Sequence, residues 1–375
     1  MDARVARFAP GSCARLVVKI GSSLLVGPDG AVRRDWLETV LDDIAARIAA
    51  GQQVVIVSSG AIALGARRLG LPKGGRASLE DAQAAAATGQ IALSQVYAEL
   101  LAARGLTAAQ ILVTLDDLED RRRFLNASAT LDRLLSLGAV PVLNENDSVA
   151  TAEIRFGDND RLAARVAQAA GAGGVILLSD VDGLYTANPT RDPNATLVPT
   201  VETVNAATEA MADDRSGSGL GSGGMVAKLQ AARIAAAAGV HLAIVNGRGA
   251  HPLAVFDADG RGTVFVAAPG ASAKKAWLAG RLTVRGKIHI DAGAVAALKR
   301  GNSLLAAGAT KVEGKFGRGD PVEILGPAGS LARGLAGYDS EDAALILGTR
   351  NDAQGAKLGY APRAALVHRD HLVML

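Results

Sequence analysis

Two lysines lie next to glycine-containing segments that could bind phosphate. Lys228 comes after the glycine- and serine-rich stretch 216–224 and starts an alanine-rich segment, and Lys19 precedes Gly21 in VVKIGSSLL. Backbone N–H groups at the start of a helix favour anions, and a lysine there adds positive charge. The dinucleotide fingerprint fits poorly because a charged, helical segment precedes Gly219, and a P-loop has no residues between its last glycine and its lysine. A flexible linker before a helix is the alternative to a phosphate site.

Polar side chains that could bind further anions or orient a substrate follow several apolar runs. Ser58 and Ser59 follow VVIV, and Ser179 and Asp180 end the run GVILLSD. Amides and carboxylates are also concentrated at Asn144, Glu145, Asn146, Asp147, Asp158, Asn159 and Asp160. Helix capping is the alternative role for Ser58, Ser59 or Asp160, because serine and aspartate are preferred N-caps. Several anion-binding positions together predict a transfer between two anions.

The apolar runs predict a buried parallel sheet. Short runs rich in Val, Ile and Leu are separated, through residues 1–270, by longer alanine-rich segments with helical spacing. The runs are ARLVVKIG, QQVVIVSSG, AQILVTL, AVPVLNEND, GVILLSDVDG and VHLAIVNG. None alternates with polar residues, so we expect strands covered on both faces by helices, which is an α/β fold. Ligands bind at the carboxyl ends of strands in such sheets, where the polar residues lie.

The sequence beyond Gly270 has a different character. It consists of short strand-like segments separated by glycines, which is typical of a small β-rich domain. It contains 15 Lys or Arg against 9 Asp or Glu, whereas the preceding part contains 25 against 28. A chain of 375 residues is expected to form two domains. We predict a catalytic domain over 1–270, a linker over 271–283 and a β-rich domain over 284–375. The basic charge of the second domain indicates a polyanionic partner or, as the alternative, only a basic surface.

Cysteine content and hydropathy bear on the compartment. Cys13 is the single cysteine, which excludes an intrachain disulfide framework and suits a reducing compartment. No stretch is apolar enough for long enough to span a bilayer, and the N-terminal residues lack the apolar core of a signal peptide. We therefore expect a cytoplasmic protein that does not associate with membranes.

Several motifs, in their order along the chain, resemble those of the amino acid kinase family. They are VVKIGSSLL, IVSSGAIALG, VLNENDSVATAEI, GDND, LLSDVDGLYTANP and GLGSGGMVAKLQAA. The resemblance covers essentially the whole chain, because the part from about Gly286 resembles a PUA domain. It implies an open, mostly parallel sheet sandwiched by helices, plus a small β-rich PUA domain. Within the family it implies the branch that uses ATP to phosphorylate the γ-carboxylate of L-glutamate, the first step towards proline.

The resemblance also implies roles for individual residues. Lys19, Lys228 and Asp160 would be catalytic, with Asp160 orienting the two lysines. The substrate positions would be Ser59, Asp147 and Asn159. The ATP positions would be Lys19, Ser179, Asp180, Ser222, Gly223, Gly224, Met225, Val226, Ala227 and Lys228. The implied cofactor is Mg²⁺, which accompanies ATP, and no protein ligand to the metal is assigned.

Phosphoryl transfer to a carboxylate agrees with these residue types. A carboxylate is ionised at neutral pH and needs no general base, which explains why no histidine occurs in the motifs. The reaction requires in-line positioning and positive charge over the transferring group, which Lys19 and Lys228 could supply from two sides. Asp147 could accept the α-ammonium group of the substrate, which a kinase for an N-acylated amino acid would not require.

The partners that the resemblance implies are L-glutamate, ATP and proline as a feedback inhibitor, and it further implies a homo-oligomer, a dimer or a tetramer. Alternatives with the same fold are kinases for aspartate, N-acetylglutamate or a nucleoside monophosphate, but NENDSV and the PUA-like tail favour glutamate. An RNA-binding protein is the alternative from another class, since PUA domains elsewhere contact RNA. The tail has few aromatic residues for base stacking, so RNA binding is not expected to be the primary activity.

Overall fold

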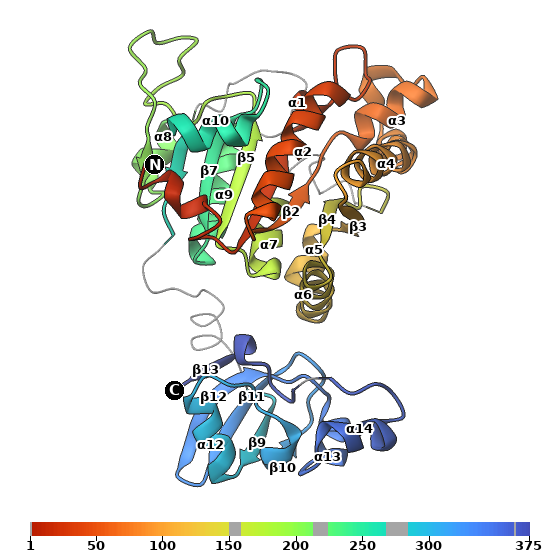
Figure 1. Cartoon of the computed structure of the whole chain (residues 1–375), viewed down its shortest axis with the longest axis vertical. Helices are drawn as coiled ribbons and strands as arrows, with labels where there is room; N and C mark the ends of the chain where they lie inside the picture. The colour runs from red at the N-terminus through yellow and green to blue at the C-terminus, as the bar shows by residue number, and fades with distance from the viewer. Residues whose placement is uncertain (1, 150–158, 213–223, 268–283, 364) are drawn as a thin grey trace. The chain divides into compact units, whose positions relative to one another are not determined.

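The chain folds into two compact units, Met1–Pro269 and Gly270–Leu375 (Figure 1). Each unit has its own hydrophobic core. The computed structural model describes residues 2–149, 159–212, 224–267, 284–363 and 365–375. The predicted linker 271–283 lies outside these residues. Within the described ranges, no helix combines the length and the apolar character that crossing a bilayer requires.

The first unit is built on an eight-stranded sheet with the strand order β3-β4-β2-β1-β5-β7-β8-β6. The strands are β1 (Arg15–Ile20), β2 (Gln53–Val57), β3 (Thr107–Val113), β4 (Ala139–Glu145), β5 (Gly174–Ser179), β6 (Thr200–Val201), β7 (His241–Asn246) and β8 (Thr263–Phe265). Neighbouring strands are parallel except for β7 and β8, which are antiparallel. The predicted open, mostly parallel sheet is confirmed, and every predicted run forms a strand. The sequence pattern missed β6 and β8, which are too short to show a periodicity.

Helices cover both faces of this sheet, as predicted for an α/β fold (Figure 1). One face packs against α2 (Arg34–Ala49), α3 (Ala61–Leu69), α4 (Leu79–Ala102) and α10 (Pro252–Asp259). The other face packs against α5 (Leu115–Glu119), α6 (Arg121–Ser136), α7 (Asn159–Ala170) and α9 (Met225–Ala237). The prediction of burial on both faces is wrong for β3, most of which is partly or fully exposed, because it is an edge strand with a single neighbour. The remaining helices of this unit are η1 (Val5–Phe8), α1 (Ser22–Leu25), η2 (Pro72–Gly75) and α8 (Ala206–Ala210).

The second unit contains a five-stranded sheet with the order β10-β9-β11-β12-β13, which confirms a β-rich module. Its strands are β9 (Gly286–Ile290), β10 (Ala309–Gly314), β11 (Pro321–Gly326), β12 (Gly329–Leu335) and β13 (Leu372–Met374). The helices among its described residues are α12 (Ala292–Lys299), η3 (Ala306–Gly308), α13 (Ser340–Leu345), α14 (Asn351–Leu358) and η4 (Arg369–His371). Not every segment of this unit is a strand, because β9 ends at Ile290 and α12 begins at Ala292. Asp291 caps α12 through the N–H of Ala294, and the alanines that follow favour a helix.

Candidate active site

The carboxyl ends of five neighbouring parallel strands lie along one edge of the first sheet. In the order β4, β2, β1, β5 and β7, these ends carry Glu145, Ser59, Lys19, Ser179 and Asn246. The strands are in register, and Lys19 is paired with residues of both β2 and β5. From the central strand β1 the sheet extends to β2 and β4 on one side and to β5 and β7 on the other. Such a switch point is where open α/β sheets bind ligands.

Asp160 forms ion pairs with both lysines. Its Oδ1 lies 2.6 Å from Nζ of Lys19, and its Oδ2 lies 2.8 Å from Nζ of Lys228. All three residues are buried, with exposed fractions of 1%, 7% and 6% for Asp160, Lys19 and Lys228. Burial raises the pKa of Asp160, but the two ammonium groups outweigh it and hold that pKa well below its usual range. Two cations and one anion give the trio a net charge of +1, which favours an anionic ligand.

Strand alternation explains why Lys19 meets Asp160. On β1, Leu16 and Val18 belong to the core on the α2 face, whereas Val17 belongs to the core on the face covered by α7 and α9. Side chains two residues apart on a strand point to the same face. Lys19 therefore points to the face of α7 and α9, which carry Asp160 and Lys228.

Small residues bring α7 and α9 close together. Asp160 is followed at intervals of three, four and seven residues by alanine, and so is Lys228. These alanines are Ala163, Ala164, Ala167, Ala231, Ala232 and Ala235, and all are fully buried. Residues with this spacing share one helix face, and small side chains permit a short interaxial distance. Asp160 and Lys228 begin these two stripes, so packing of the stripes brings the two charges into contact.

Ser58 and Ser59 point in opposite directions at the end of β2. The hydroxyl of Ser58 lies 3.0 Å from that of Tyr97 on α4, and the hydroxyl of Ser59 accepts a hydrogen bond of 2.8 Å from Nδ2 of Asn159. Neither serine caps α3. The N-cap is Gly60, whose φ of +98° suits glycine, and it makes no side-chain cap bond. The capping alternative for these serines is therefore wrong.

Asn144, one of the amides predicted at a strand end but given no individual role, joins Asn159 to the end of β4. Nδ2 of Asn159 donates to Oδ1 of Asn144 at 3.0 Å and to the backbone oxygen of Ser58 at 2.7 Å. Both asparagines are buried. Its position at the carboxyl end of a buried strand, in the motif NEND, marked Asn144 as a candidate, and the structure adds its contact with Asn159.

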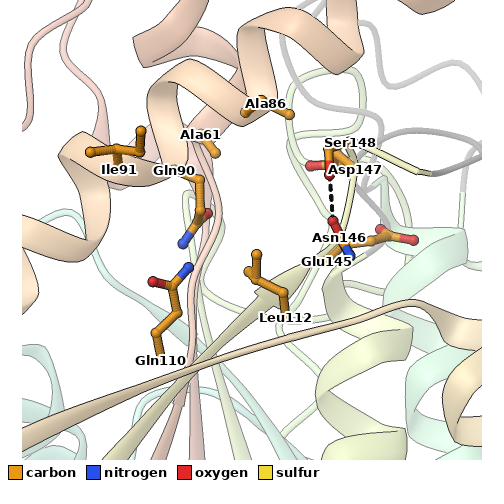
Figure 2. A pocket seen from close by; sticks show the side chains of 11 residues that line it. Ala61, Ala86, Gln90, Ile91, Gln110, Leu112, Glu145, Asn146, Asp147 and Ser148 are labelled. Atoms are coloured by element: carbon orange, nitrogen blue, oxygen red, sulfur yellow. Dashed lines mark hydrogen bonds between the residues drawn. The ribbon is translucent and has the colours of Figure 1, made fainter.

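Asp147 lines a cavity of about 190 Å³ next to this network, as Figure 2 shows. The other residues lining it are Ala61, Ala86, Ala87, Gln90, Ile91, Gln110, Leu112, Glu145, Asn146 and Ser148. Oδ1 of Asp147 is buried and has no hydrogen-bond partner among the described residues. Burial raises the pKa of Asp147 to about 6, although Arg76 acts in the opposite direction. A cationic group entering this cavity would satisfy that oxygen.

The predicted ATP positions lie at the other side of the edge, after β5 and at the start of α9. The hydroxyl of Ser179 donates to Oδ1 of Asp180 at 3.3 Å, and the backbone oxygen of Ser179 accepts from Gly247 at 2.8 Å. Gly224 is the N-cap of α9, and no side chain of a described residue caps this helix, so its first N–H groups can receive an anion. The first turn of α9 carries Met225, Val226, Ala227 and Lys228. Ser222 and Gly223 lie outside the described residues.

Comparison with known proteins supplies the family. Residues 14–246 match the model of the amino acid kinase family, and residues 286–353 match that of the PUA domain. The chain is 69% identical to the glutamate 5-kinase of Sphingopyxis alaskensis, over 98% of this chain and 99% of that protein. It is 65% identical to the glutamate 5-kinase of Zymomonas mobilis subsp. mobilis, over 98% and 93% of the two chains. For the glutamate 5-kinase of Novosphingobium aromaticivorans the identity is 61%, over 97% of each. The chain therefore belongs to the amino acid kinase family, in the glutamate 5-kinase branch that these relatives represent.

Proposed function

We propose that this protein transfers the γ-phosphoryl group of ATP to the γ-carboxylate of L-glutamate, forming L-glutamyl 5-phosphate in the first step of proline biosynthesis. The observation that carries the proposal is the buried ion-paired trio Lys19, Asp160 and Lys228 at the central strand of the sheet. The full-length similarity to glutamate 5-kinases supports the choice of substrate.

The order of the strands separates an acceptor side from a nucleotide side. Ser59 and Asp147 follow β2 and β4, and Asn159 contacts Ser59, so we assign L-glutamate to that side. Ser179 and Gly224 lie on the side of β5 and α9, and we assign ATP there. The trio lies between the two sides, where a phosphoryl group would pass from one substrate to the other. Because the acceptor carboxylate is already ionised, no proton has to be removed from it.

The two lysines would stabilise the charge of the transferring phosphoryl group. Positive charges placed in advance where negative charge develops are effective because they need no reorganisation during the reaction. Asp160 contributes by holding the two ammonium groups on either side of one carboxylate. We therefore assign Asp160 an orienting and electrostatic role rather than that of a base.

Mg²⁺ fits this site as an ion that enters with ATP. In the parts of the chain that the structure describes, no three His, Cys, Asp or Glu side chains form a group that could hold a metal. Mg²⁺ commonly keeps several waters and binds through substrate phosphates with only one or two carboxylates. When bound, the ion would neutralise charge on the phosphate oxygens. The residues of the acceptor side and the nucleotide side would still position the two substrates.

Three further proposals rest on family membership and not on a contact in the structure. They are inhibition by proline, assembly into a homo-oligomer and RNA binding by the second unit as a secondary property. Activity without inhibition at millimolar proline, a monomer in light scattering and no salt-sensitive RNA binding would each remove one of them.

The proposed reaction is tested by trapping the acyl phosphate with hydroxylamine in the presence of Mg²⁺ and ATP. L-glutamate is expected to give hydroxamate, whereas aspartate, N-acetylglutamate and a sample without substrate are not. Lys228→Ala should lower kcat by about 100-fold or more, since it removes one of the charges that stabilise the transferring group. The control is Lys357→Ala, which changes an exposed lysine of α14 and should leave the rate unchanged. Hydroxamate from a different acid would show that the acceptor is that acid and not L-glutamate. No hydroxamate from any acid would refute the proposal.

The KM for L-glutamate is expected to depend on pH through Asp147. Because the pKa of Asp147 is raised to about 6, its carboxyl group is neutral below that pH and loses its attraction for the α-ammonium group. KM should rise about tenfold for each pH unit below 6 and level off above it, with little change in kcat. In Asp147→Asn, KM should be high at every pH. Initial rates between pH 5 and pH 8 provide the measurement, and a KM that stays flat in the unmodified protein would contradict the role of Asp147.

A further inference from the structure

A line of side-chain hydrogen bonds connects helix α4 with the proposed substrate residues. Nδ2 of Asn159 donates to Asn144, and Nδ2 of Asn144 donates to Oε1 of Gln90 at 2.8 Å. Nε2 of Gln90 in turn donates to the hydroxyl of Ser94 at 3.2 Å. Figure 2 shows Gln90 at the wall of the cavity, where it lies across from Gln110. Gln90 is not one of the substrate positions considered so far.

Two backbone groups determine the direction of this line. The backbone oxygen of Ser58 can only accept, so the nitrogen of the Asn159 amide has to face it. The backbone N–H of Glu145 can only donate, and it donates to Oδ1 of Asn144 at 3.0 Å. Nδ2 of Asn144 must therefore point away from Glu145 and towards Gln90, whose Oε1 accepts from it. The orientation of both asparagines follows from these contacts.

The orientation of Asn159 leaves its oxygen for a ligand. With Nδ2 turned towards Ser58, Ser59 and Asn144, the remaining polar atom is Oδ1, which is buried and has no hydrogen-bond partner among the described residues. Oδ1 of Asp147 is likewise buried and has no hydrogen-bond partner among the described residues. Buried acceptors without a donor are costly, so both atoms call for a ligand group rich in N–H donors. An ammonium group has three donors and no acceptor.

We propose that Gln90 is a positioning residue that makes this site select substrates with a free α-ammonium group. The backbone groups of Ser58 and Glu145 set the arrangement in which Asn159 presents an oxygen rather than a nitrogen. By accepting from Asn144, Gln90 stabilises that arrangement further. A dicarboxylic acid without the ammonium group would leave both acceptors unsatisfied, and an N-acylated amino acid would have too few donors. This inference rests on the proposed function, because it concerns recognition of the same acceptor.

The backbone of Gln90 is itself held firmly. The preceding residue, Gly89, packs against α3 so closely that a Cβ atom there would lie 1.8 Å from the backbone oxygen of Ala61. Gly65 on α3 makes the reciprocal approach, with an added Cβ 1.7 Å from the backbone oxygen of Ala85. A helix fixed in this way can hold the Gln90 side chain at one distance from Asn144.

The test compares L-glutamate with glutarate, which has the same two carboxylates and no ammonium group. We would measure the KM for L-glutamate and the inhibition constant of glutarate against it, in the full-length protein. Gln90→Met removes the hydrogen-bond acceptor and keeps the approximate size of the side chain. Gln90→Ala also removes the acceptor, and its small side chain cannot cause a steric conflict. Gln90→Glu keeps an acceptor oxygen at the end of the side chain. The matched control is Gln95→Met, an exposed glutamine of the same helix that donates to Glu99. Thermal unfolding of each variant establishes that it is folded.

Gln90→Met and Gln90→Ala are expected to raise the KM for L-glutamate about tenfold, the effect of losing one hydrogen bond that orients the site. The inhibition constant of glutarate should change less than about threefold, so that discrimination between the two acids decreases. Gln90→Glu should retain most of the discrimination between L-glutamate and glutarate, and Gln95→Met should resemble the unmodified protein. A parallel rise in both constants, or no change in either, would overturn the role of Gln90. If the unmodified protein formed no acyl phosphate from L-glutamate, the proposed function itself would have failed first.

Discussion

Asp160→Asn is expected to reduce kcat by at least about 100-fold while ATP still binds. The substitution removes the carboxylate that lies 2.6 Å and 2.8 Å from the two buried ammonium groups, so the charge of the trio changes from +1 to +2. The two ammonium groups then repel each other and lose the carboxylate that holds them in a common orientation. Affinity for ATP should be retained because the remaining cations still attract its phosphates.

The same substitution should also destabilise the first unit. Removing one partner of a buried ion pair leaves uncompensated charge in the interior, which costs about 3–5 kcal/mol. Kinetics with saturating ATP, ATP binding by calorimetry and thermal unfolding separate the effect on rate from the effect on stability. Asp42→Asn is the control, since this carboxylate pairs with Arg104 and its side chain is 52% exposed. Such pairs contribute about 1 kcal/mol or less. Activity of Asp160→Asn within fivefold of the unmodified protein would refute the role of the trio.

Gly89→Ala is expected to be among the most destabilising single substitutions in the chain. The new methyl group would lie 1.8 Å from the backbone oxygen of Ala61 and 2.6 Å from the backbone nitrogen of Gly65, and neither backbone group can move without its helix. Helices α3 and α4 would have to separate. We expect a loss of at least about 3 kcal/mol, which lowers the unfolding midpoint of a unit of this size by roughly 6 °C or more.

Catalysis should be affected together with stability in this variant. Helix α3 starts at Ala61, two residues after Ser59, and α4 carries Gln90. Separation of the helices therefore disturbs both contacts to the asparagines. The KM for L-glutamate should therefore rise even below the unfolding midpoint. Gly355→Ala is the control in another helix, because its Cβ would meet only ordinary contacts, the nearest at 3.5 Å. It should be neutral or stabilising by up to about 1 kcal/mol. An unfolding midpoint of Gly89→Ala equal to that of the unmodified protein would show that the close contact between α3 and α4 is not rigid.

The residues of the predicted site differ in how far the sequence could place them. The sequence alone places three site residues at one edge of the first sheet, namely Lys19, Ser59 and Ser179. Each of them follows or ends an apolar run, and the carboxyl ends of parallel strands lie at the same edge. The same argument placed Asn144 there. Gln90 could not be placed in this way, because it lies within a long helix and no pattern distinguishes it from Gln95.

The N-terminal residues before β1 show a similar limit. Their sequence indicated no role, yet Phe8 is fully buried and packs edge to face against Phe256. Its backbone oxygen accepts hydrogen bonds from Arg47 and Gln52. A single aromatic residue in a short irregular segment has no periodicity from which burial can be read, so only the surrounding packing decides it.

The sequence by itself determined the α/β class, the buried strands, the β-rich second unit and the family, because strand burial and motif order are local properties of the chain. The family resemblance implied that Asp160 orients Lys19 and Lys228, but only the tertiary structure places the three side chains in contact, with Asp160 68 residues from Lys228. It also decided that the amide of Asn159 is oriented through Asn144. These contacts depend on which helix covers which face of the sheet and on how closely alanine and glycine let the helices approach. Such distances arise from packing between remote segments, and no local pattern of residues encodes them.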